Sequence, residues 1–171
     1  MKRMMTAAAI LGAGLGTAPG ASTLRFSAPG EGCPIVAAGD ATEAERYAAK
    51  ELADHLGRMT GAAFPLTPES PDPGPAIVLS YDAQLCGEEY RLRADPATGR
   101  LSIAGGRPRG VLYGVYGLLE DRLGIRWFTR DAAQIPKVAT LTLPADLDMR
   151  VRPRREYREV FWTDAFDGDW T

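Results

Sequence analysis

The 171-residue sequence contains a single histidine, His55, and only two cysteines, Cys33 and Cys86. Zinc sites are usually built from closely spaced His, Cys and carboxylate ligands, as in C-x-x-C or H-E-x-x-H. Neither motif occurs, so the sequence predicts no metal site and excludes a zinc peptidase. A histidine beside an apolar helix face, with no carboxylate motif nearby, is typical of packing rather than of general base catalysis.

An excess of positive charge is also lacking. The 20 Lys and Arg residues are balanced by 22 Asp and Glu residues, and the net charge is −2. A chain with this balance has no overall attraction for nucleic acid or for an anionic membrane, so we expect neither as a partner. The basic residues near the end alternate with acidic ones, which is typical of a solvated connecting segment. They are Arg150, Arg152, Arg154, Arg155 and Arg158.

The apolar run near the start is too short to span a bilayer. It extends from Ala7 to about Ala18, follows Lys2 and Arg3, and precedes small residues, which is the pattern of a secretory signal peptide. We therefore expect residues 1–22 to be a signal and the mature chain to be secreted or periplasmic. Thr17 stands where G-x-G-x-x-G needs its third glycine, so no nucleotide cofactor, nor any other, is predicted.

Cys33 and Cys86 allow two interpretations. In an oxidising compartment a disulfide between them would close a loop of about fifty residues and stabilise the fold by ~4 kcal/mol in the chain-entropy model. The alternative is two unpaired, buried thiols. It is favoured because nothing in the spacing brings the two residues together.

The rest of the chain predicts a single domain of mixed secondary structure. Thr42 and Glu45 form a capping box that begins a helix, and Gly61 is placed to end it. The apolar stripe of this helix predicts that it covers one face of a sheet. Strands are expected within residues 23–29, 34–39, 76–80, 89–106 (a hairpin) and 139–144.

The stretch "RGVLYGVYGLLEDRLGIRWF", residues 109–128, predicts a second helix that contains several glycines. Glycine inside a helix costs roughly 0.5–1 kcal/mol relative to alanine, so its presence needs a reason. Gly110, Gly114 and Gly117 are spaced four and three residues apart and therefore share one helix face. We expect a close-packed helix, buried between this domain's sheet and another domain that docks on it, with Gly124 as its cap.

These elements together resemble the N-terminal, non-catalytic α/β domain of α-glucuronidases, family-20 β-hexosaminidases and their uncharacterised secreted relatives. The resemblance covers about residues 23–147. It implies an α+β fold, a two-layer α/β sandwich with a mixed sheet and two main helices on one face, packed beside a (β/α)8 barrel. Residues 148–171 would then be a linker and the start of a truncated catalytic barrel, because "REYREVFWTDAF" resembles a first barrel strand.

The function implied by this resemblance is that of a non-catalytic accessory domain in a secreted carbohydrate-active enzyme. The barrel, in the same polypeptide, would hold the catalytic carboxylates and the carbohydrate substrate. Arg158 is the nearest match to the arginine that contacts the sugar in family-20 enzymes. Barrel active sites need several strand ends and only one is present here, so Asp164, Asp167 and Asp169 are not expected to be catalytic.

The alternative function is that of a free-standing, secreted module that binds glycans or has a structural role. Trp127, Tyr113 and Tyr116 are the aromatic side chains that would serve as stacking platforms for sugars. Their place on, or directly after, a buried helix favours core packing instead.

Overall fold

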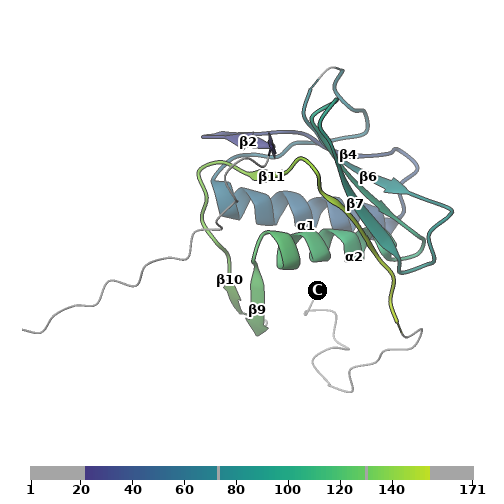
Figure 1. The fold of residues 1–171 in the computed structure, drawn as a ribbon. Coiled ribbons are helices and arrows are strands. Elements are labelled where there is room, and N and C mark those ends of the chain that lie inside the picture. Colours follow the sequence, from purple (N-terminus) through teal and green to yellow (C-terminus); the bar gives the residue numbers. More distant parts are fainter. Residues whose placement is uncertain (1–21, 73, 130, 155–171) are drawn as a thin grey trace, which may run out of the picture.

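The structure is a computed structural model, and it describes residues 22–72, 74–129 and 131–154. Two helices lie side by side against one face of a mixed β-sheet (Figure 1). This arrangement confirms the α+β class, with a sheet and a helical layer. The expected barrel strand lies outside the described residues.

The first helix, α1 (Glu43–Thr60), begins and ends as its sequence predicts. The Thr42 backbone N–H donates to the Glu45 carboxylate at 2.7 Å, and the Thr42 hydroxyl accepts from the Glu45 N–H at 3.3 Å. Gly61 ends the helix with a left-handed φ of 74°, which glycine adopts without steric cost. The buried stripe then packs on the sheet. Its apolar members are Ala48, Ala49, Leu52, Leu56 and Met59.

The main sheet has six strands, in the order β12-β7-β8-β6-β4-β5. Strands β8, β6, β4 and β5 pair with one another in parallel, whereas β7 is antiparallel to both β8 and β12. The bounds are Asp148–Val151, Tyr90–Asp95, Arg100–Gly105, Ile77–Tyr81, Ile35–Ala37 and Leu66–Thr67, in that order.

The register of this sheet places large apolar side chains on the face that the helices cover. Ile35, Ile77 and Leu101 stand in one row across β4, β6 and β8, and none of the three is exposed. The alternate residues, such as Ser102 and Arg93, face away from the helices and are partly or fully exposed. One face of the sheet therefore forms the core, as a half-buried sheet requires.

The second helix, α2 (Gly110–Gly117), lies directly on this core. A Cβ atom at Gly114 would lie 2.8 Å from Cγ2 of Ile103, and one at Gly117 would overlap the hydroxyl of Tyr90. At Gly110 it would overlap the carbonyl oxygen of Glu89. The close-packed glycine face is thus present. These glycines contact β7, β8 and the residue before β7 in this same domain, so the glycine face is filled from within it; docking of another domain on this helix stays a prediction.

The continuation of α2 also differs from the expected single helix. A π-helical turn, η1 (Leu118–Arg122), follows directly, and Gly124 has a left-handed φ of 74°. Leu118, Leu119 and Leu123 are all buried. All three leucines belong to the hydrophobic core.

Short strand pairs complete the fold around this sandwich. β1 (Thr23–Arg25) pairs with β11 (Thr142–Pro144), and β2 (Ser27–Ala28) pairs with β3 (Glu31–Gly32). A hairpin of β9 (Arg126–Thr129) and β10 (Ala132–Gln134) projects away from the sandwich (Figure 1). Phe128 in this hairpin is 64% exposed.

The domain extends beyond the boundary expected at residue 147. Strand β12 forms the edge of the main sheet, with Met149 opposite Leu92 and Arg150 opposite Arg91. Arg150 is therefore a strand residue and not part of a solvated connector. Its guanidinium donates to the carboxylate of Glu89 at 2.6 Å, and Glu89 is only 2% exposed. The hydrogen bond from Arg150 lowers the pKa of Glu89 to about 2.

We expect Gly114→Ala to destabilise the domain, because the new methyl group would press on the stiff, buried side chain of Ile103. Overpacking costs about 1–3 kcal/mol, which exceeds the helix-propensity gain of roughly 0.5–1 kcal/mol. Gly57→Ala, in the interior of α1 with its nearest atom at 3.4 Å, is the matched control and should be stabilising. Urea unfolding followed by circular dichroism checks both. A more stable Gly114→Ala variant would contradict the packing described here.

We expect Glu89 to contribute to stability at neutral pH and to lose that contribution in acid. Its pKa is lower in the folded chain than the usual 4.5, so its contribution is complete above pH 4.5 and disappears as the pH falls towards 2. The free energy of unfolding should therefore depend less on pH between 4.5 and 2 in Glu89→Gln than in the wild type. Equal pH dependence of the two proteins, measured by urea unfolding, would contradict this contribution of Glu89 to stability.

Candidate functional site

The aromatic side chains proposed as sugar platforms pack against the body of the domain. The Trp127 ring meets the rings of His55 and Tyr116 edge-on, at centroid distances of 5.5 Å. The Tyr116 hydroxyl donates to the Glu51 carboxylate at 3.0 Å, and burial raises the pKa of this phenol. Tyr113 is also half-buried against the core. These residues join α1, α2 and β9, which confirms the packing interpretation.

His55 has the packing role that the sequence predicts. Its side chain is buried, and its Nδ1 lies 2.8 Å from the carbonyl oxygen of Glu51. The Trp127 ring packs edge-on against the imidazole ring. These contacts hold the imidazole inside the helical layer, away from the two cavities described next.

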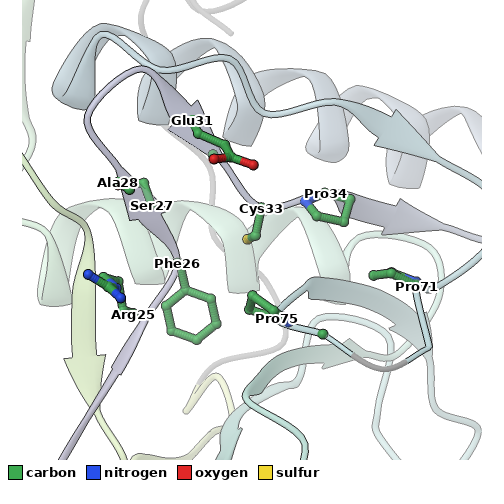
Figure 2. A pocket seen from close by; sticks show the side chains of 11 residues that line it. Arg25, Phe26, Ser27, Ala28, Glu31, Cys33, Pro34, Pro71 and Pro75 are labelled. Atoms are coloured by element: carbon green, nitrogen blue, oxygen red, sulfur yellow. The ribbon is translucent and has the colours of Figure 1, made fainter.

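The first cavity, of about 390 Å³, lies between the β1–β3 segment and the loop before β6, which contributes Pro71, Gly74 and Pro75 to its lining. Figure 2 shows Phe26, Cys33 and Pro75 around its middle, with Glu31 at one side and Arg25 at another. Burial raises the pKa of the Cys33 thiol to about 12. A thiol that stays protonated is a poor nucleophile and a poor metal ligand, so Cys33 gives this cavity no reactive group.

Cys33 and Cys86 are two free thiols in the structure, the first buried and the second exposed. They lie in different places: Cys33 lines the cavity of Figure 2, whereas Cys86 is in the loop after β6, where its backbone N–H donates to Glu89. The two cysteines are therefore unpaired, as the favoured interpretation has it, but Cys86 is exposed and not buried.

The second cavity is a cleft of about 330 Å³ at the carboxyl ends of the parallel strands β4 and β6. From β4 the chain runs through α1 to β5 on one side, and from β6 it runs to β7 on the other. Because the two connections diverge, a crevice opens between the strand ends. In open α/β sheets this is the usual place for a ligand. We therefore take this cleft as the candidate functional site.

The cleft contains one arginine, two carboxylates and an exposed tyrosine. Arg107, just after β8, donates through Nε and Nη2 to the two carboxylate oxygens of Glu45, at 3.0 and 3.2 Å. The same guanidinium lies 4.5 Å from the centroid of the Tyr81 ring. Asp40 and Ser80 also line the cleft, and Asp40 adds a second negative charge near Arg107.

Two opposing effects set the charge state of Glu45. Burial raises its pKa, but the hydrogen bonds from Arg107 and from the Thr42 backbone outweigh burial and hold the pKa below its usual value. The carboxylate is therefore ionised and already engaged. Sequence reasoning used Glu45 only as a helix cap and the loop before α2 only as a turn, and it missed Tyr81. The three residues are far apart in sequence, so no local pattern joins them.

Other predicted site residues lie outside this geometry. Arg158 and the three aspartates at positions 164, 167 and 169 fall outside the described residues. Within the part of the chain that the structure describes, no group of three or more His, Cys, Asp or Glu side chains is placed to hold a metal ion. In the same part, none of the helices combines the length and the apolar character needed to cross a membrane.

Comparisons with known proteins give matches in structure but not in sequence. No protein-family model matches the chain, and no curated protein matches it. A solved 4-O-methyl-α-glucuronidase of glycoside hydrolase family 115, described as specific for decorated arabinogalactans, matches 79% of this chain with a TM-score of 0.61 and 19% identity. The β-hexosaminidase of Streptomyces plicatus matches 82% with a TM-score of 0.57 and 22% identity.

A third structure gives the same result. The family-20 exo-β-N-acetylglucosaminidase of Vibrio harveyi matches 80% of this chain with a TM-score of 0.52 and 17% identity. This chain spans 19%, 25% and 18% of the three chains, respectively. At such low identity the likeness shows the fold alone. The chain resembles one domain of these glycoside hydrolases.

We expect the two cysteines to differ sharply in reactivity. At pH 8 only about one Cys33 thiol in ten thousand is ionised if its pKa is about 12, and the thiolate is the reactive form. Iodoacetamide should therefore modify the exposed Cys86 in the folded protein and both cysteines in guanidinium chloride. Mass spectrometry of the alkylated chain, with Cys86→Ser as control, measures this. Modification of Cys33 in the folded control would contradict its buried placement.

Proposed function

We propose that this chain is the non-catalytic, N-terminal accessory domain of a secreted carbohydrate-active enzyme, a glycoside hydrolase related to α-glucuronidases or β-hexosaminidases. One observation carries the proposal. The fold matches about four fifths of this chain in enzymes of two glycoside hydrolase families, yet it accounts for only a fifth to a quarter of their length. Most of the length of these enzymes therefore lies outside this domain. In this proposal the corresponding part of the present protein is a catalytic (β/α)8 barrel in the same polypeptide.

The chemistry of the described carboxylates supports a non-catalytic role. A glycosidase needs one carboxylic acid with a raised pKa as proton donor, next to a second carboxylate. The two buried glutamates are instead each bonded to an arginine, Glu45 to Arg107 and Glu89 to Arg150, and both pKa values are lowered. Neither is suited to protonate a leaving group at neutral pH.

Two further parts of the proposal concern residues at the ends of the chain. Residues 1–22 would direct secretion and be removed, which N-terminal sequencing of the exported protein tests. Arg158 would contact the sugar from the first barrel strand. The barrel itself would carry the catalytic carboxylates, with the described domain packed beside it.

We expect the 171-residue chain to have no glycosidase activity, because its two buried glutamates, Glu45 and Glu89, are ionised and already bonded to arginines. The longest polypeptide encoded by the gene should hydrolyse chromogenic glycosides, and Arg158→Ala in that polypeptide should raise KM more than it lowers kcat. The assay uses 4-nitrophenyl β-N-acetylhexosaminides and aryl α-glucuronides, with both proteins at equal concentration. Hydrolysis by the 171-residue chain alone would overturn the non-catalytic assignment. Inactivity of the longer polypeptide towards a broad glycoside panel would overturn its place in a glycoside hydrolase.

A further inference from the structure

The cleft between β4 and β6 contains an aromatic ring with a free surface. Tyr81 is 47% exposed although the Arg107 guanidinium covers one face of its ring at 4.5 Å. The exposed area therefore belongs to the other face and the edge of the ring. Phe128 is also exposed, but it lies in the projecting β9–β10 hairpin, outside this cleft. Of these two exposed aromatic side chains, Tyr81 therefore lines the cleft and Phe128 does not.

The charges around Tyr81 disfavour an anionic ligand. The bidentate pair with Glu45 already compensates the charge of Arg107, and Asp40 adds a negative charge. The lining therefore repels carboxylates and phosphates. A guanidinium carries five N–H donors, and the pair with Glu45 uses two of them. The remaining donors of Arg107 and the oxygens of Asp40 can bond to uncharged hydroxyl groups.

The size of the cleft limits the ligand further. Its volume of about 330 Å³ is at the lower end of the range for small-molecule sites, roughly 300–1,000 Å³. One or two sugar rings fit this limit. A pyranose also has an apolar C–H face for an aromatic ring and hydroxyl groups around its rim, which is the combination of surfaces that the cleft presents.

We propose that this cleft is a binding site for a neutral pyranose, with the sugar ring on Tyr81 and its hydroxyl groups bonded to Arg107 and Asp40. The choice of a carbohydrate rests on the proposed function; the preference for a neutral sugar over an anionic one rests on the charges of the cleft. Binding here serves attachment to a glycan and involves no chemical step.

The test is a titration of the 15N-labelled, 171-residue chain with the methyl glycosides of glucose, galactose, mannose and N-acetylglucosamine, followed by NMR. At least one should shift the amide signals around Asp40, Tyr81 and Arg107. Sodium glucuronate should bind at least about threefold more weakly than that sugar, because of the negative lining. Absence of shifts for all four glycosides up to roughly 100 mM would overturn the inference, and so would equal binding of glucuronate.

The variants separate stacking from an effect on the fold. Tyr81→Ala should weaken binding at least about fivefold, whereas Tyr81→Phe, which retains the ring, should stay within about twofold of wild type. Phe128→Ala removes an exposed aromatic outside the cleft and should change nothing. Weakening by Phe128→Ala, or none by Tyr81→Ala, would refute the assignment. Sugar binding by this chain together with an inactive longer polypeptide would contradict the proposed function and leave this inference standing. An active longer polypeptide together with no sugar binding by this chain would support the proposed function and overturn this inference.

Discussion

The direct contact between the backbone of α2 and the sheet is the constraint on which the rest of the fold depends. At Gly105 and Gly106 a side chain would overlap the backbone of Val111 and of Cys86, and at Gly110 it would overlap the carbonyl of Glu89. Glycine is required on both sides of this contact, which leaves no gap for solvent. The loop between β8 and α2 contains Arg107, whose side chain donates a hydrogen bond to Glu45 of α1. The close approach of helix and sheet therefore fixes where Arg107 lies in the cleft at the strand ends.

Long-range ion pairs add a second level of organisation. Glu45 with Arg107 links α1 to the turn after β8, and Glu89 with Arg150 links the start of β7 to the edge strand β12. Each pair has a buried carboxylate and a partly exposed arginine. Exposed ion pairs contribute little to stability, but a buried carboxylate without its partner is costly. These pairs thus fix how distant segments align.

The sequence predicts the locally encoded parts of this fold well. The cap at Thr42, the left-handed Gly61 and the hairpin of β7 and β8 depend on neighbouring residues, and all are present. The spacing of Gly110, Gly114 and Gly117 correctly indicates a close-packed face, but spacing cannot show which surface fills it. Strand β12 was missed because its exposed charges conceal the alternation of Met149 and Val151. The cleft was missed because its residues meet only after the sheet is assembled.

The pairing of β1 with β11 sets an order for folding during synthesis. Thr23 pairs with Pro144, and the Phe26 backbone N–H donates to the carbonyl of Leu141. Strand β1 therefore cannot form its pairing until β11 has been synthesised. At roughly 5–20 residues per second, the ribosome needs on the order of ten seconds to deliver that partner. During this interval Phe26, which is 1% exposed in the folded domain, has no finished core to enter. The parallel strands and α1 can assemble first, and the N-terminal segment closes over them as a late step of a high-contact-order topology.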